Sequence, residues 1–79
     1  MTPPPTTLAD CKAGSRVQVL SIEVAHASRQ RLLEMGLTVG SPIEVVRFAP
    51  MGDPVEIRVR GYHLSLRKAE AASISVQLL

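Results

Sequence analysis

Short runs of alternating apolar and polar residues occupy most of this chain, and this period of two indicates β-strands with one buried face. The clearest run is Val55–Arg60, in which Val55, Ile57 and Val59 are separated by charged residues. Glycine, proline or small polar residues bound most of the runs, as is typical of turns. The predicted strands are Arg16–Val24, Pro42–Phe48, Val55–Arg60, Tyr62–Leu66 and Ser73–Leu79.

The first predicted strand has a break in its alternation. Val17 and Val19 share one face, and Leu20, Ile22 and Val24 then occupy the other face. An extra residue in one strand of a pair produces this change of face, so we expect a β-bulge or strong bend near Val19 and Leu20. A bend of this kind suits a small barrel.

A helical pattern interrupts the strands at residues 31–40, RLLEMGLTVG. Ser28 is expected to be the N-cap, because its hydroxyl can accept a hydrogen bond from an exposed amide of the first turn. Gly36 fits the left-handed position that follows a helix, which allows Leu37 to pack back on Leu32. The sequence therefore predicts a short helix that ends at Gly36.

Three further segments predict tight connections. The segment Ala49–Pro54 contains two prolines and a Gly-Asp pair, Gly61 marks a reversal between two strands, and Arg67–Ala72 is expected to form about one helical turn. The residues expected to shape the turns are Ser28, Gly36, Gly40, Pro50, Gly52, Asp53, Pro54 and Gly61.

Short strands with tight links predict a mainly β fold. We expect a small SH3-like barrel of about five strands with one or two short helices, and a small OB-like barrel is the alternative. Closure of a barrel removes the exposed edges that a lone meander would present. Residues 1–7, MTPPPTT, are expected to be a flexible proline-rich N-terminus, and residues 8–79 to form the domain.

Composition narrows the classes of function. The net charge is only +2, and Phe48 and Tyr62 are the only aromatic residues. Modules that bind single-stranded nucleic acid or proline-rich peptides need aromatic platforms, so neither ligand is expected. Cys11 is the single cysteine, which excludes an intramolecular disulfide and fits a reducing compartment. With no long apolar run for membrane insertion, a cytoplasmic protein is expected.

Three motifs in order give the sequence a family resemblance. RLLEMGLTVG is followed by APMGDPVEIRVRG and then by LSLRKAEAA, within the segment Arg31–Val76. Their order and spacing closely resemble the FeoA family, small cytosolic proteins of bacterial ferrous iron uptake. The segment from LADCKAG onward also fits the usual start of that domain.

The resemblance implies an SH3-like fold and a non-enzymatic accessory role beside FeoB, the membrane permease with a cytosolic GTP-binding domain. On this reading the chain would be cytoplasmic and peripheral to the inner membrane through FeoB, with a weak homo-oligomer left open. The same domain occurs in iron-dependent repressors of the diphtheria-toxin-repressor type, so a metal-sensing module is the alternative function. A nucleic-acid-binding barrel is a third and weaker hypothesis.

The apolar residues of the short helix and its turn support two interpretations. Neighbouring leucines diverge by about 100° around a helix, so Leu32 and Leu33 cannot both face one small interior. Either all of these residues serve the core, or some also line an exposed groove that contacts a partner. The candidate partner-binding residues are Leu32, Leu33, Met35, Leu37, Met51, Arg58 and Arg60.

Metal-binding residues are sparse. Cys11, His26 and His63 are the weak candidates, with Asp10 and Glu23 as further oxygen donors. None of them forms a close pair of the kind that structural metal sites use. No cofactor is certain from the sequence, which leaves open a divalent ion, either Fe²⁺ or adventitious Zn²⁺.

Overall fold

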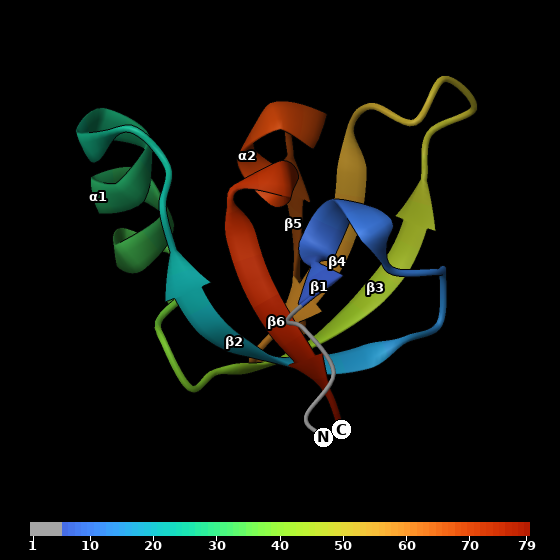
Figure 1. The fold of residues 1–79 in the computed structure, drawn as a ribbon, viewed down its shortest axis with the longest axis horizontal. Helices are drawn as coiled ribbons and strands as arrows, with labels where there is room; N and C mark the ends of the chain where they lie inside the picture. The colour runs from blue at the N-terminus through green and yellow to red at the C-terminus, as the bar shows by residue number, and fades with distance from the viewer. Residues whose placement is uncertain (1–5) are drawn as a thin grey trace.

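The computed structural model describes residues 6–79, which fold into one curled antiparallel sheet with short helices at one end (Figure 1). In chain order the elements are β1 (Thr6–Thr7), the 3₁₀ helix η1 (Leu8–Asp10), β2 (Arg16–Ile22), α1 (His26–Glu34), β3 (Pro42–Phe48), β4 (Val55–Val59), β5 (Tyr62–Leu66), α2 (Lys68–Ala72) and β6 (Ile74–Leu78). The fold is mainly β, as the alternation predicts.

The sheet has the strand order β1-β6-β2-β3-β4-β5, with every neighbouring pair antiparallel. β1 and β5 stand at the two ends of this order among residues 6–79, so the sheet curls into a barrel without a closing strand pair. Its concave side holds a single apolar core. Val55 and Val59 of β4 and Val45 of the neighbouring β3 are completely buried in it. The predicted SH3-like barrel is confirmed.

Strand bounds follow the sequence pattern closely. The predictions Pro42–Phe48 and Tyr62–Leu66 match β3 and β5. The strand β4 stops at Val59, because Arg60 and Gly61 both have positive φ and form the two-residue turn that leads to Tyr62. The predicted reversal at Gly61 is therefore confirmed.

The predicted bulge lies in β2, where the register with β6 shifts between Val19 and Ser21. The prediction that Leu20 and Ile22 share a face is wrong. Leu20 is the extra residue and is 40 % exposed, whereas Ile22 returns to the buried face beside Val19. One inserted residue restores the inward orientation of the residues that follow it.

The N-terminal end contains structure that the sequence pattern does not predict. Thr6 and Thr7 pair with Val76 and Ser75 of β6, and Leu8 is completely buried in the core. Thr6 and Thr7, which the sequence analysis assigns to the proline-rich N-terminus, are thus part of the sheet. The prediction of a flexible start for residues 1–5 falls outside the described residues.

The end of α1 has the geometry that the glycine predicts. The Leu37 N–H donates to the Leu32 carbonyl at 2.9 Å, and the Gly36 N–H donates to the Leu33 carbonyl at 3.0 Å. Gly36 has a φ of +92°, so this pair of bonds is a Schellman motif. Leu32 and Leu37 are both completely buried, which confirms that the chain folds back under the helix.

The start of α1 corrects the prediction for Ser28. The helix begins at His26, and the Arg29 N–H donates to the Ala25 carbonyl at 2.8 Å. Ser28 is therefore the third residue of the helix, not its N-cap. The three residues directly before Ser28, at positions 25–27, include no proline or β-branched side chain, so the helix extends through them at low cost.

Candidate partner-binding surface

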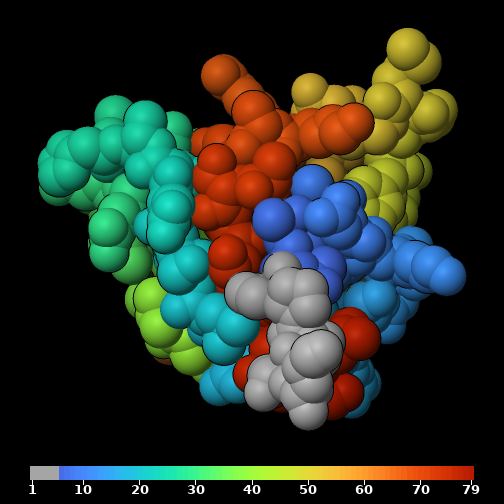
Figure 2. Space-filling model, in the orientation of Figure 1, coloured from blue at the N-terminus to red at the C-terminus, as the bar shows by residue number. Residues whose placement is uncertain are grey.

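The helices α1 and α2 and the turn at residues 49–54 lie together at one end of the barrel, opposite the C-terminus (Figure 1). We call this the helical end. Figure 2 shows the surface of α2 between those of α1 and the turn. A pocket of about 320 Å³ joins the three segments, with Ser28 and Arg31 from α1, Glu70 from α2 and Pro54 from the turn among its lining residues.

Glu70 is the centre of a polar network at the helical end. Its side chain is only 10 % exposed, and its Oε2 accepts a hydrogen bond from Arg31 Nη2 at 2.6 Å. Its Oε1 accepts the backbone N–H of Arg67 at 3.0 Å, which satisfies an amide at the start of α2. Glu70 thus ties α2 to α1 across the pocket.

The ionisation of Glu70 reflects these contacts. Burial alone would raise the pKa of Glu70, but the Arg67 N–H, the Arg31 guanidinium and the Ser28 hydroxyl outweigh it and lower the pKa below its usual value. The carboxylate is therefore charged at neutral pH, and the interface between the helices is an ion pair rather than an apolar contact.

The turn at residues 49–54 is attached to α2 by a second polar contact. The Gly52 N–H donates to the Ala49 carbonyl at 2.7 Å, and Gly52 has a φ of +82°, which confirms the predicted turn. Asp53 Oδ1 accepts the backbone N–H of Lys68 at 3.1 Å. A side chain from the turn therefore caps the first residue of α2, a role that the sequence pattern does not reveal.

The structure separates the candidate apolar residues into buried and exposed ones. Leu32 and Leu37 have no exposed surface, so their assignment to a partner-binding surface is wrong: both belong to the core. Met35 is partly buried against the core. Leu33 is 42 % exposed on α1 and Met51 is 90 % exposed at the tip of the turn. Two of the candidate apolar residues are thus available to a partner at the helical end.

The basic candidates do not form one patch. Arg67 lies in the pocket of the helical end, whereas Arg58 and Arg60 line a separate pocket on the outer face of the sheet. Arg58 also forms an ion pair with Glu44 at 3.3 Å. The two basic candidates from the sequence, Arg58 and Arg60, therefore do not line the pocket of the helical end.

The candidate metal ligands come from three separate elements. His26 is the first residue of α1, His63 points outward from β5, and Cys11 is buried after η1 with its Sγ donating to the Thr7 carbonyl. Burial, together with the nearby Asp10 carboxylate, raises the pKa of the Cys11 thiol. Within residues 6–79 the structure brings no three His, Cys, Asp or Glu side chains together as a metal site.

Sequence reasoning missed Glu70 and Arg31. Glu70 resembles any surface carboxylate in the KAEAA turn, and it is not among the candidate residues of the sequence analysis. One local signal does exist, since Glu70 stands three residues after the N-cap Arg67, the spacing of a carboxylate that reaches back to the cap amide. Nothing local indicates Arg31, which lies 39 residues away from Glu70.

Comparison with known proteins identifies the family of this chain. The model of the FeoA domain family matches residues 6–78. The chain belongs to the FeoA family. The matched residues run from β1 to the end of β6, so the FeoA domain includes the short N-terminal strand.

One curated FeoA relative is a fusion protein. The Fe(2+) transport protein A/Fe(2+) transporter FeoB fusion protein of Porphyromonas gingivalis is 39 % identical over 72 residues. The match covers 91 % of this chain and 8 % of that relative. The chain therefore spans only a small part of the fusion protein.

Solved structures show the same fold. The solution structure of the FeoA protein from Chlorobium tepidum is 42 % identical, with a TM-score of 0.90, over 94 % of this chain and 70 % of that chain. A manganese-dependent transcriptional repressor superposes with a TM-score of 0.85 at 24 % identity, over 99 % of this chain and 38 % of that chain. The latter similarity shows a shared fold alone.

The helices within residues 6–79 are short, and α1 is the longest with nine residues. None of the helices there is both long enough and apolar enough to cross a bilayer.

Proposed function

We propose that this FeoA-family chain is a non-enzymatic accessory protein of ferrous iron uptake that docks on the cytosolic part of a FeoB-type transporter. The observation that carries the proposal is the P. gingivalis relative, in which an FeoA sequence and FeoB are one polypeptide. A covalent link keeps two domains at high local concentration, so fusion favours pairs of domains that act on one another. In a separate chain, a binding surface has to replace that link.

The helical end is the surface we assign to this contact. Leu33 on α1 and Met51 on the turn are large exposed apolar side chains of this end. They belong to two segments that line the pocket containing Glu70, although neither side chain lines the pocket itself. An unbranched methionine adapts to the shape of a partner, and burial of exposed apolar side chains drives association. The network of Glu70, Arg31 and Asp53 holds the two segments in fixed relative positions, so the surface is formed before binding.

Docking on FeoB would keep this chain in the cytoplasm and peripheral to the inner membrane, without a membrane-spanning segment of its own. The FeoB segment that receives it is the cytosolic GTP-binding domain or an adjacent cytosolic face of the permease. The accessory role requires no catalytic residue in this chain, since its effect on transport would follow from binding.

Co-purification tests the proposal. The purified cytosolic domain of the FeoB-type transporter from the same genome is mixed with this chain, and the complex is measured by size-exclusion chromatography and calorimetry. We expect Leu33→Asp and Met51→Asp each to weaken the complex by about tenfold or more, since each places a charge in an apolar contact.

A matched control is Leu78→Asp, which changes a leucine of β6 near the C-terminus that is 68 % exposed, between the exposures of Leu33 and Met51. This variant should bind the transporter domain as the wild type does. Equal loss of binding in all three folded variants would contradict the assignment of the surface. Absence of binding by the wild-type chain to both the cytosolic domain and the full transporter would contradict the function itself.

A further inference from the structure

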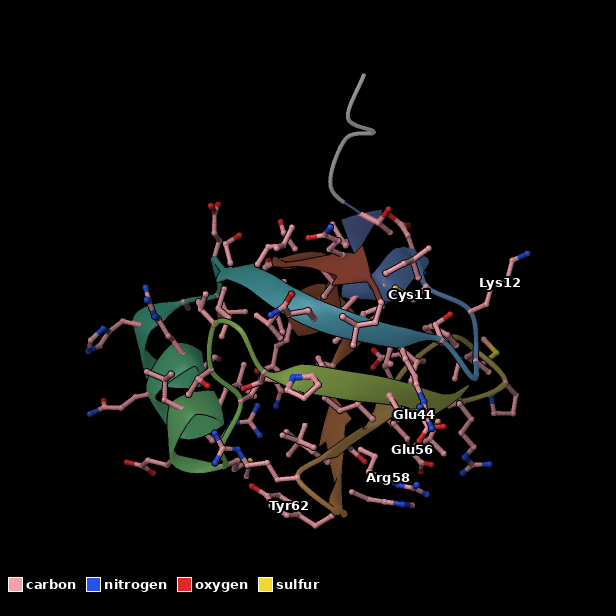
Figure 3. All side chains as sticks on the ribbon, turned by 90° about the horizontal axis from the view of Figure 1, so that it is seen from below. Cys11, Lys12, Glu44, Glu56, Arg58 and Tyr62 are labelled. Carbon is pink, nitrogen blue, oxygen red and sulfur yellow. The ribbon has the colours of Figure 1, made fainter. Side chains whose placement is uncertain are left out.

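A row of charged side chains crosses the outer face of the sheet, away from the helical end. Arg16 of β2 is paired with Glu44 of β3, and Glu44 is paired with Arg58 of β4. Directly opposite residues of neighbouring strands project to the same face, so these three side chains lie side by side. Figure 3 shows Glu44 and Arg58 close together on this face.

Two pockets meet beside this row. One, of about 350 Å³, includes Arg16, Arg58 and the C-terminal Leu79 in its lining. The other, of about 440 Å³, lies along residues 38–42. Both are lined by Pro42 and Arg60, so the two pockets adjoin at these residues. We call the pair of adjoining pockets the Arg60 groove and define it by Arg16, Val39, Pro42, Arg58, Arg60 and Leu79.

The backbone of Arg60 is unusual. Its φ of +51° is the left-handed conformation, and it occupies a hairpin position that glycine, asparagine or aspartate adopts more readily. A bulky residue at such a position costs conformational energy, and this kind of strain is typical of functional sites. The Arg60 side chain runs along Gly36, since its Cδ lies 3.4 Å from the point that a Cβ on Gly36 would occupy. Arg60 itself lines both pockets, at the place where they adjoin.

The charges of the groove are incompletely balanced. Glu44 is the only acidic side chain among the residues that line it, and Glu44 is paired with Arg58 at 3.3 Å. Within residues 6–79, neither Arg16 nor Arg60 forms a salt bridge. Two guanidinium groups are therefore free to bind carboxylates, with exposed apolar side chains at the two ends of the groove: Val39 is 60 % exposed and Leu79 is 71 % exposed.

We propose that the Arg60 groove binds an acidic, extended peptide segment of a partner protein. Carboxylates of the segment pair with Arg16 and Arg60, because guanidinium groups recognise carboxylates through two parallel hydrogen bonds. Apolar residues that flank the acidic ones pack on Val39 and Leu79. The proposal does not rest on the transporter, since no residue that defines the groove belongs to α1, α2 or the 49–54 turn.

A peptide fits this groove better than a nucleic acid does. Glu44 stands between Arg16 and Arg58, where it would repel a continuous phosphate backbone, whereas a peptide can place its carboxylates on either side of it. The groove also lacks a row of aromatic side chains on which bases could stack. Charge complementarity and the apolar ends together select an acidic segment that also carries leucine-like side chains.

Titration followed by amide NMR tests the proposal on the whole chain. The probe is a capped decapeptide that alternates aspartate or glutamate with leucine, and the control probe has asparagine and glutamine in place of the acids. We expect the acidic peptide to shift the amide signals of Val39, Gly40 and Gly61 and the side-chain Nε–H signals of Arg16 and Arg60. The uncharged peptide should bind at least about tenfold more weakly, since it loses both charge-assisted contacts.

Two variants locate the contact. Arg60→Asn removes the charge and keeps a residue that tolerates positive φ, and Arg16→Gln removes the second guanidinium. Each variant should weaken binding of the acidic peptide by about three- to tenfold, while its amide spectrum stays that of a folded chain. The matched control is Lys12→Gln, which removes the same charge from a side chain that points away from the groove in Figure 3 and should leave binding within about twofold.

Three outcomes would overturn the proposal. One is no shift at any peptide concentration that dissolves, and another is equal weakening by the Lys12 and arginine variants, which would mean attraction by net charge alone. The third is binding of a short oligothymidylate, or of a phosphatidylglycerol vesicle, that is as tight as binding of the peptide and depends in the same way on Arg16 and Arg60. Binding of the peptide with failure of the transporter complex would overturn only the proposed function.

Discussion

The hydroxyl oxygen of Tyr62 lies 2.9 Å from the position that a Cβ on Gly36 would occupy. Gly36 ends α1 and Tyr62 begins β5, so this contact joins the helix cap to the edge strand of the sheet. Residue 36 thus combines two requirements, a left-handed backbone with a φ of +92° and the absence of a side chain.

Gly36→Ala is expected to destabilise the chain by more than the left-handed backbone alone explains. The backbone strain costs about 1–2 kcal/mol, and displacement of Tyr62 adds to it. Gly40→Ala is the matched control, because Gly40 has a φ of +90° with no atom within 4 Å of the added Cβ. Urea unfolding measures both free energies of unfolding.

The double variant separates the two contributions at residue 36. In a Tyr62→Phe background, Gly36→Ala should cost less than in the wild type and approach the cost of Gly40→Ala, because the phenol oxygen is absent. Equal costs of the alanine substitution in both backgrounds would show that Tyr62 does not restrict residue 36.

Glu70→Gln is expected to destabilise the chain near neutral pH by about 1–3 kcal/mol, since it leaves the Arg31 guanidinium without its charged partner. The pKa of Glu70 is lowered below its usual value in the folded chain, so its stabilising effect is complete above the pKa of an unperturbed glutamate. The effect is lost as the pH falls through the folded pKa. Thermal unfolding at a series of pH values should therefore show the difference between variant and wild type shrinking below about pH 4.5.

Glu56→Gln provides the control for this pH series. The Arg47 guanidinium also lowers the pKa of Glu56, through a hydrogen bond of 2.8 Å, but this pair is exposed on the sheet. Screening by salt weakens exposed pairs, so the Glu56 variant should differ little from wild type in salt. A Glu56 effect as large as that of Glu70 would show that burial between the helices is not what makes the Glu70 pair important.

Leu37→Ala is expected to lower the free energy of unfolding by about 2–5 kcal/mol, because Leu37 is completely buried and its loss leaves a cavity under α1. Val39→Ala, two residues later, removes an exposed side chain and should change stability by less than about 0.5 kcal/mol. Urea unfolding measures both values. A cost for Leu37→Ala as small as that for Val39→Ala would contradict its place in the core.

Metal binding by this chain is expected to be weak and distributed, because His26, His63 and Cys11 lie on separate elements. Anaerobic calorimetry with Fe²⁺, and a parallel titration with Zn²⁺, should give no single tight site. Removing His26 and His63 one at a time should weaken only the binding at each histidine. One tight site lost in both variants would instead establish a shared metal centre between them.

Much of the fold is predictable from the sequence because its causes are local. Alternation along β3 and β5 fixes their bounds, since every second side chain must face the core. The end of α1 follows from Gly36, because the two bonds of the Schellman motif span only six residues. The start of α1 is less certain, and the prediction of Ser28 as its cap was wrong because several residues before it also tolerate a helix.

The candidate surface is less predictable because it depends on segments that are distant in sequence. The choice between Leu32 and Leu33 required the position of α1 on the barrel, and the structure buries Leu32 while it exposes Leu33. The basic residues near the end of the chain resemble one cluster in the sequence, yet Arg60 and Arg67 line different pockets.

The sequence by itself determined the strands, the bulge in β2 and the glycine that ends α1, because these depend on backbone geometry and alternation within a few residues. Only the tertiary structure decided the burial of Glu70 against Arg31, the pairing of Thr6 and Thr7 with β6, and the junction of two pockets at Arg60. The physical reason is that desolvation and ion pairing depend on which side chains the folded barrel brings together, and local sequence does not encode those distances.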